Sequence, residues 1–211
     1  MARYVLEQSP FSHFFTADNR SALLWLVLRI YVGYEWFIAG WEKLFINHGW
    51  IYDWIVNRQG HFDPIWINHL WIGSSAGAGI SGFVQGALHK TAAFCLPAPA
   101  PCHPDVQTWY ATFLQVAVQP HSIIWSYAIT FGELAVGLGL IFGILTGAAA
   151  FFGGFMNLNF MLAGTVSINP ILFTLAIGLV LARRVAGHYG LDYWILKLLH
   201  RSIRQKNLTS G

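Results

Sequence analysis

The sequence has few charged residues, and this scarcity excludes most soluble proteins. Only 10% of its 211 residues are charged, whereas about a quarter of the residues in a typical soluble domain are. Hydrophobic residues make up 55%, with ten Trp and sixteen Phe. This composition predicts an integral membrane protein. The net charge of +3 does not indicate a nucleic-acid partner, because the basic residues lie beside apolar segments, where lipid headgroups are the expected anions.

Several motifs are also missing. No short apolar run with a cleavage site opens the chain, and Glu7, Asp18 and Arg20 fall in its first segment, so no signal peptide is predicted. No Cys-x-x-Cys-His motif occurs and no His lies in a predicted span, which argues against haem. A metal site is conceivable at residues 61–63 or 102–105, but neither has a recognised ligand spacing, so we predict none.

Four apolar segments are long enough to cross a bilayer, because a hydrocarbon core of ~30 Å needs about 20 helical residues. They cover residues 21–43, 122–145, 146–164 and 170–187. Helices are expected because open strands would leave backbone groups without hydrogen bonds in lipid. Small residues four apart in the last three segments favour close helix packing. The sequence therefore predicts an all-α membrane protein, a single domain built as a four-helix bundle.

The distribution of Lys and Arg predicts the orientation, with both termini on the cytoplasmic side of a multi-pass plasma-membrane protein. Residues 1–20 are then cytoplasmic, and residues 44–121 form a long outer loop. Within this loop, helical spacing over 105–118 predicts an interfacial helix. The glycine-rich stretch 70–88 is interpreted as re-entrant or interfacial. Residues 192–206 have the pattern of an amphipathic helix on the cytoplasmic leaflet.

Two charges lie inside predicted spans, Arg29 in the first and Glu133 in the second. Because a charge at bilayer depth costs at least ~2.5–3.5 kcal/mol, such residues are expected to be paired or functional. We predict an Arg29–Glu133 pair, with Asn157 and Asn159 satisfying the remaining polar groups. The alternative is a purely structural pair that fixes helix register. Glu35 lies deep enough to be a second partner for a cation or a proton carrier.

The two cysteines, Cys95 and Cys102, both lie in the outer loop, where a disulfide would persist. Three prolines between them favour an extended chain. Fully extended, the two ends would be about 20 Å apart, well beyond the ~4.4–6.8 Å between Cα atoms in a disulfide. A bridge therefore requires a turn or a cis proline, and both states stay open.

Three motifs resemble the DoxX/DoxD family of four-helix membrane proteins. They are the run around Glu133 at residues 131–140, the pattern around Arg29 at residues 28–44, and Asn157-Leu158-Asn159. The similarity extends over roughly residues 21–194. It implies a relation to DoxD, the membrane subunit of thiosulfate:quinone oxidoreductase, which oxidises thiosulfate to tetrathionate and passes electrons to quinone. A DoxA-like partner subunit is also implied, and nothing in this chain resembles DoxA.

Together, the resemblance and the residues predict a quinone-linked oxidoreductase subunit that acts on thiosulfate or a related sulfur anion. Trp36 and Trp41 belong to a group of Trp residues that offers a flat surface for a quinone ring, although an aromatic belt is the alternative. Arg29 or Lys43 would bind the anion, and Glu133 or Glu35 would supply protons to the reduced quinone. Asn157 and Asn159 complete the expected quinone-binding residues.

A further hypothesis assigns chemistry to the cysteines. If Cys95 and Cys102 form a disulfide, thiosulfate would attack it and a second thiosulfate would release tetrathionate, leaving a dithiol for quinone to reoxidise. Two functions of other classes remain as alternatives: a non-catalytic membrane anchor for a redox complex, and a small-anion transporter. The transporter is less favoured because the spans lack inverted repeats and broken helices.

Overall fold

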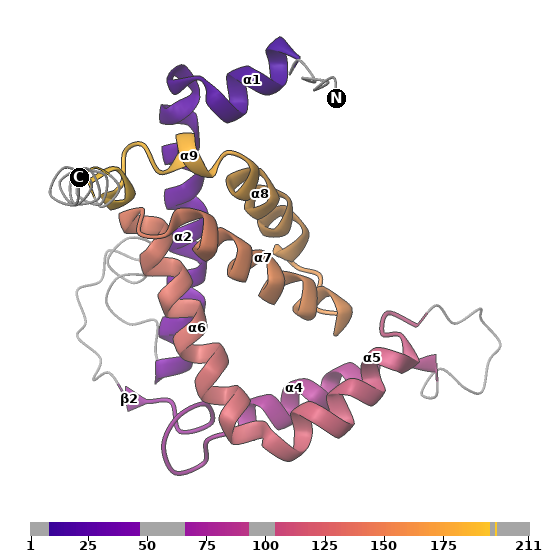
Figure 1. The fold of residues 1–211 in the computed structure, drawn as a ribbon. Helices are drawn as coiled ribbons and strands as arrows, with labels where there is room; N and C mark the ends of the chain where they lie inside the picture. The colour runs from indigo at the N-terminus through magenta and orange to yellow at the C-terminus, as the bar shows by residue number, and fades with distance from the viewer. Residues whose placement is uncertain (1–8, 47–65, 93–103, 195–196, 198–211) are drawn as a thin grey trace, which may run out of the picture.

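The structure is a computed structural model that describes residues 9–46, 66–92, 104–194 and 197 (Figure 1). Cys95 and Cys102 lie outside the described residues, as do residues 61–63 of the first metal candidate and most of the amphipathic helix expected at 192–206. The disulfide hypothesis therefore stays a prediction.

The described chain is helical apart from one pair of two-residue strands. Its elements, in chain order, are α1 (Pro10–Ala17), η1 (Asn19–Ser21), α2 (Ala22–Leu44), β1 (Phe45–Ile46), β2 (Trp66–Ile67), α4 (Ala78–Leu88), α5 (Thr108–Phe113), the π-helical turn η4 (Leu114–Val118), η5 (Gln119–His121), α6 (Ser122–Phe142), α7 (Thr146–Leu162), α8 (Asn169–Leu181) and α9 (Arg183–Ala186). Strand β1 pairs antiparallel with β2.

All four predicted spans contain helices, which confirms a helical architecture. Two continuous helices, Asn19–Leu44 and Thr108–Phe142, are long and apolar enough to cross a membrane. Helices α7 and α8 have 17 and 13 residues, so at 1.5 Å per residue they are only about 25 and 20 Å long. The second predicted span ends early because Gly143 adopts a left-handed conformation (φ 67°) that stops α6.

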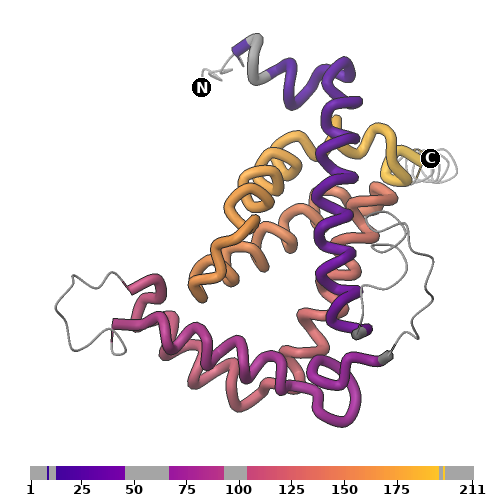
Figure 2. Tube along the Cα trace, turned by 180° about the vertical axis from the view of Figure 1, so that it is seen from behind, coloured from indigo at the N-terminus to yellow at the C-terminus, as the bar shows by residue number. Residues whose placement is uncertain are grey.

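Helices α2 and α6 lie side by side and antiparallel, and the α7–α8 hairpin packs beside them (Figures 1 and 2). Helices α4 and α5 run alongside each other and extend to one side from the end of α6 that is remote from α1 and α9, below the α7–α8 hairpin in Figure 1. We call α4, α5 and η4 the arm. Their buried side chains, including Ile80, Val84, Tyr110 and Leu114, form a second core together with Ala163, which follows α7. The helix predicted over residues 105–118 is confirmed as α5 and η4.

Glycines set the register between α2 and α6. A Cβ at Gly33 would lie 2.9 Å from the backbone nitrogen of Ile141, and one at Gly137 would lie 2.5 Å from the backbone nitrogen of Phe37. Larger residues would push the two backbones apart, because small residues are what allow two helices to approach this closely. Residues that face each other on α2 and α6 therefore have numbers that add up to 174, as 33 and 141 do and as 37 and 137 do. This register determines which buried charges can meet.

Candidate functional site

The facing sides of α2 and α6 are each made of residues spaced alternately four and three apart, which places them on one helix face. On α2 these residues are Arg29, Gly33, Trp36, Gly40 and Lys43, and on α6 they are Ser126, Thr130, Glu133, Gly137 and Leu140. All are buried except Lys43, which is half-buried. Both faces thus carry polar or charged residues into the interior.

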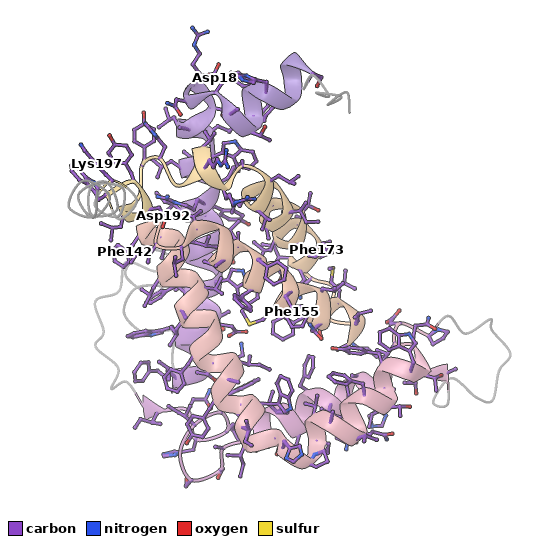
Figure 3. The ribbon with its side chains drawn as sticks, in the orientation of Figure 1. Asp18, Phe142, Phe155, Phe173, Asp192 and Lys197 are labelled. Atoms are coloured by element: carbon purple, nitrogen blue, oxygen red, sulfur yellow. The ribbon has the colours of Figure 1, made fainter. Side chains whose placement is uncertain are left out.

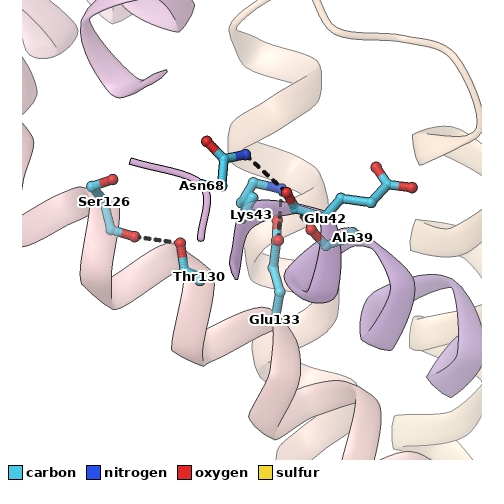
Figure 4. A network of polar contacts seen from close by, with 7 residues as sticks. All are labelled: Ala39, Glu42, Lys43, Asn68, Ser126, Thr130 and Glu133. Atoms are coloured by element: carbon cyan, nitrogen blue, oxygen red, sulfur yellow. Dashed lines mark hydrogen bonds and ion pairs between the residues drawn. The ribbon is translucent and has the colours of Figure 1, made fainter. Parts of the chain in front are cut away.

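Lys43 and Glu133 form a buried ion pair (Figure 4). The ammonium Nζ of Lys43 donates to Oε2 of Glu133 at 2.6 Å and to the carbonyl of Ala39 at 3.3 Å. It also lies 5.0 Å from the centre of the Trp71 ring, a cation–π geometry. The Glu133 side chain is 1% exposed and that of Lys43 is 18% exposed. The pair is therefore reached by solvent only from the Lys43 side.

The segment after β2 covers this pair. Pairing of β1 with β2 brings Asn68 to the end of α2, where its amide donates to the carbonyl of Glu42 at 2.9 Å. Farther on, the hydroxyl of Ser126 donates to the carbonyl of Trp71 at 2.6 Å. These two bonds hold the Trp71 ring beside Lys43 and close off the end of the α2–α6 interface.

Three buried polar side chains near this pair keep atoms that have no hydrogen-bond partner among the described residues: Oε1 of Glu133, Nε1 of Trp36, and both amide atoms of Asn157. Glu133 and Asn157 have no exposed surface and Trp36 is 3% exposed. An unsatisfied buried polar group costs about 1–3 kcal/mol, so it is rarely kept without a purpose.

The helix packing brings these three side chains to one region between α2, α6 and α7. A Cβ at Gly153 would lie 2.9 Å from Nε1 of Trp36 and 3.0 Å from Cγ1 of Val136. Glu133 precedes Val136 by one turn and Asn157 follows Gly153 by one turn. Since α6 and α7 are antiparallel, the Glu133 carboxylate and the Asn157 amide lie at the same height along the two helices. We call Lys43, Glu133, Trp36 and Asn157 the polar centre.

The predicted Arg29–Glu133 pair is wrong. Arg29 donates instead to two carbonyls, from Nη1 to Ala186 at 2.9 Å and from Nη2 to Tyr189 at 3.0 Å. The α2–α6 register places Glu133 opposite residue 41, so Arg29 lies twelve residues, or about 18 Å, farther along α2. A side chain cannot span that distance. Lys43, two residues from the level of Glu133, takes the place that the sequence analysis gave to Arg29.

A groove of about 780 Å³ runs between α6 and α7 along the outside of the polar centre. Its lining is apolar, and Gly132 and Met156, the chain neighbours of Glu133 and Asn157, belong to its wall. The Met156 sulfur lies 3.6 Å from the position of a Cβ at Gly132. Because a Met side chain is flexible, movement of Met156 would open the wall that separates the groove from the polar centre.

No protein-family model, curated protein or solved structure matches this chain. The DoxX/DoxD resemblance therefore stays a prediction, and the functional argument depends on the residues of the polar centre. No group of three His, Cys, Asp or Glu in the described part of the chain is arranged to hold a metal ion.

The structure places the other predicted site residues elsewhere. Trp41 packs between the rings of Phe37 and Phe45, and Glu35 is half-buried beside the phenol of Tyr31. Neither residue lies on the face of α2 that carries Lys43. The expected quinone surface of Trp36 and Trp41 is therefore divided between two sides of α2.

The side-chain amide of Asn159 already has hydrogen-bond partners, in the part of α7 that lies next to the arm. It accepts a hydrogen bond from the Tyr110 hydroxyl at 3.0 Å and donates to the carbonyl of Phe155 at 2.8 Å. The expectation that Asn157 and Asn159 satisfy groups around the predicted pair is wrong for Asn159, which is committed to Tyr110. Of the two, Asn157 alone belongs to the polar centre.

Sequence reasoning missed the role of Lys43 as the partner of Glu133. Lys43 ends the first predicted span, where a charge is expected to lie at the membrane surface and to bind an anion. A usable signal was present, because Lys43 continues the four-three spacing of Arg29, Trp36 and Gly40. Aligning Gly33 and Gly40 against Gly137 would have placed it beside Glu133.

Proposed function

We propose that this chain is a multi-pass membrane protein that binds a quinone at the polar centre and serves as the membrane subunit of a quinone-reducing oxidoreductase. One observation carries the proposal: Glu133 has one oxygen bound by Lys43 and the other without a partner, at the level of the Asn157 amide, and the unpartnered Trp36 N–H lies one turn of α6 away, at the level of Val136. Quinone oxygens accept hydrogen bonds and need protons on reduction, and this centre offers both N–H donors and an acid.

Membrane placement is supported by the distribution of side chains in addition to helix length. Large apolar residues on the outside of α2, α6, α7 and α8 are more than half exposed, among them Leu23, Val27, Phe131, Phe151 and Ile171. The polar centre is buried. This arrangement is the reverse of a soluble protein, and an exposed apolar surface of this extent indicates a lipid environment.

We further propose that α2, α6, α7 and the α8–α9 segment make four crossings with both termini in the cytoplasm. Helices α7 and α8 are shorter than the hydrocarbon core, and local thinning of the bilayer accommodates short spans at a modest cost. The arm then lies at the outer interface, and the Lys43–Glu133 pair lies near the outer end of α2.

The apolar groove between α6 and α7 is the proposed route for the quinone. Its volume of about 780 Å³ falls within the ~300–1,000 Å³ range of small-molecule sites. An isoprenoid tail fits an apolar channel that faces lipid, while the ring reaches the polar centre where Met156 moves away from Gly132. The groove thus provides a path from the lipid phase to Glu133 without passage through water.

Each residue of the polar centre has a role in this proposal. A bound quinone takes up two electrons and two protons and leaves as quinol. The Trp36 and Asn157 N–H groups orient its oxygens, and Glu133 relays to them, one at a time, the two protons that it takes from the Lys43 ammonium. Lys43 fixes the Glu133 carboxylate by its 2.6 Å bond and, being 18% exposed, connects it to protons from the outer aqueous phase.

The resemblance to DoxD suggests thiosulfate as the electron donor. Two thiosulfate ions that join through a new sulfur–sulfur bond release two electrons, which balances the reduction of one quinone. The proposal assigns this oxidation to the outer face, with the participation of a DoxA-like or other redox subunit. The quinone site itself does not depend on the identity of the donor.

The test measures quinone binding and quinol formation by the purified chain in proteoliposomes. Wild-type protein should bind a short-chain ubiquinone with quenching of Trp fluorescence, and Trp36→Phe should lose most of that quenching. With thiosulfate as donor, Glu133→Gln should lower the rate of quinol formation by about a hundredfold, the usual lower range for general acid catalysis. Glu35→Gln is the matched control and should stay within about twofold of wild type.

The outcomes separate the alternatives. Binding of quinone without turnover would assign the electron-donating step to a second subunit and make this chain its membrane anchor. Absence of quinone binding, or full activity in Glu133→Gln, would overturn the proposal. Uptake of thiosulfate into vesicles without quinol formation would instead favour the transporter.

A further inference from the structure

A second pocket lies at the opposite end of the molecule from the Lys43–Glu133 pair. It has a volume of about 610 Å³ and lies where the α6–α7 turn meets α9 and the chain that follows. Its polar lining is mainly basic, with Arg183, Arg184, His188 and Lys197. The polar centre does not use this pocket.

The basic side chains of this pocket are available to an anion. Neither guanidinium of Arg183 and Arg184 has a hydrogen-bond or ion-pair partner among the described residues, and both side chains are exposed. The stem of Arg183 packs against Gly147, since a Cβ there would lie 2.9 Å from its Cδ. Lys197 lies over the rings of Tyr193 and Trp194 at 5.7 and 5.6 Å.

The one acid in the pocket wall is already engaged. The carboxylate of Asp192 accepts hydrogen bonds from the backbone nitrogens of Leu145 at 2.7 Å and Thr146 at 2.8 Å, where it caps the start of α7. The labels in Figure 3 show Asp192 next to the end of α6 and Lys197 farther out. The pocket therefore keeps a net positive charge.

The basic pocket adjoins the apolar groove. Leu145 and Ala148 line both of them, so a molecule at this point would meet cations at one end and hydrocarbon at the other. Exposed aromatic residues surround the basic end: Tyr189, Tyr193 and Trp194 are 55%, 43% and 59% exposed. Tyr and Trp prefer the level of the lipid headgroups.

We infer that this pocket binds the headgroup of an anionic phospholipid, with an acyl chain that lies along the groove past Leu145 and Ala148. The positive charge of the pocket favours an anionic headgroup. The apolar groove beside it favours a lipid over a free anion, because a lipid also has a hydrocarbon chain to place there. The inference goes beyond the proposed quinone reduction. It requires a membrane around the protein and no redox chemistry.

Native mass spectrometry of the full chain in detergent micelles tests the inference with phosphatidylglycerol and phosphatidylcholine as probes. Wild-type protein should retain phosphatidylglycerol at least about tenfold more tightly than phosphatidylcholine. Each Lys or Arg near a membrane surface contributes about fivefold to the binding of anionic lipid, so Arg184→Gln should weaken phosphatidylglycerol binding about fivefold. Arg20→Gln is the matched control: it removes one exposed cation outside the pocket and should change affinity less than twofold.

A second variant separates lipid from free anion. Ala148→Trp fills the junction between pocket and groove without a change of charge and should weaken phosphatidylglycerol binding while Arg184 stays in place. Equal losses in Arg184→Gln and Arg20→Gln would show general surface attraction and overturn the site. Displacement of the lipid by millimolar inorganic phosphate, with Ala148→Trp behaving as wild type, would assign the pocket to a free anion and also overturn it. Quinone activity enters none of these measurements.

Discussion

Helix α2 buries two basic residues, Arg29 and Lys43, and the structure neutralises them in different ways. Arg29 is 1% exposed and donates to the carbonyls of Ala186 and Tyr189. Lys43 contacts a carboxylate and an aromatic ring. The guanidinium offers a fork of fixed N–H groups that suits two carbonyls, whereas the ammonium is a compact point charge whose protonation can change. The first is suited to hold helices together and the second to take part in chemistry.

The surroundings of the two residues follow the same division. The Arg29 guanidinium is enclosed by backbone, since a Cβ at either Gly143 or Gly190 would collide with it. Both sites keep one buried polar atom without a partner among the described residues, Nε of Arg29 and Oε1 of Glu133. Enclosure by backbone on both sides indicates a structural role for Arg29, whereas the Lys43–Glu133 pair is partly open to solvent and lies beside the groove between α6 and α7. Substitutions at the two sites should therefore differ in whether they affect stability or ligand binding.

Replacing Arg29 should destabilise the protein most. Arg29→Met removes two charge-assisted hydrogen bonds, each of which contributes about 1.5–3 kcal/mol, so the free energy of unfolding should fall by about 3–6 kcal/mol. Detergent-titrated unfolding followed by circular dichroism measures it. Quinone affinity of the folded fraction should not change, and a selective loss of quinone binding would contradict the structural role.

Gly143→Ala should be the next most damaging change. It introduces a Cβ against the Arg29 guanidinium at a residue whose φ is 67°, and overpacking together with a left-handed backbone costs about 2–4 kcal/mol. Gly82→Ala is the control, because a Cβ there meets nothing within 4 Å. It should raise stability by up to about 1 kcal/mol through helix propensity. Comparable losses in both variants would refute the packing argument.

A pair of double-mutant cycles should distinguish the two basic residues directly. Lys43→Met and Glu133→Leu remove the two sides of one ion pair, so their effects on unfolding should be non-additive by about 1–3 kcal/mol. Arg29→Met and Glu133→Leu affect sites about 18 Å apart and should add within about 0.5 kcal/mol. Coupling between Arg29 and Glu133 as large as that between Lys43 and Glu133 would restore the pairing that the structure rejects.

The smallest of these effects is expected at the cap of α7. Asp192→Ala removes the carboxylate that accepts from Leu145 and Thr146, and loss of such a cap costs about 1 kcal/mol. Asp192→Asn keeps one acceptor oxygen and should recover about half of the loss. The same unfolding titration measures both variants. A loss above about 3 kcal/mol would mean that Asp192 also neutralises Arg29 at longer range.

The helices themselves could be predicted from the sequence, because long apolar runs with few charges define them. The start of the fourth predicted span, residue 170, lies one residue from the start of α8 at Asn169. The continuity of α5 with α6 could not be predicted, because Pro120 lies between them and a proline is expected to end a helix. The chain passes this proline as the short turn η5, after the π-helical turn η4, and the combined helix Thr108–Phe142 has 35 residues.

The continuity of α5 with α6 explains why the partner of Glu133 could not be deduced from the positions of the charged residues within their predicted spans. The middle of α6 is not the middle of the bundle, because the helix extends beyond the end of α2, and Glu133 lies level with residue 41. The partners of Arg29 were beyond prediction for another reason: they are backbone carbonyls 157 and 160 residues away. No local spacing reports on such a contact, whereas the glycine positions on α2 and α6 do report on register.

The sequence distance between Lys43 and Glu133 has a consequence for biosynthesis. Ninety residues separate them, and ribosomes add about 5–20 residues per second. The first helix therefore waits roughly 5–18 s before its partner emerges. During that interval the ammonium at its end lacks Glu133 and must be stabilised by water or by a nearer carboxylate. The α7–α8 hairpin, whose two helices follow each other directly, has no comparable delay.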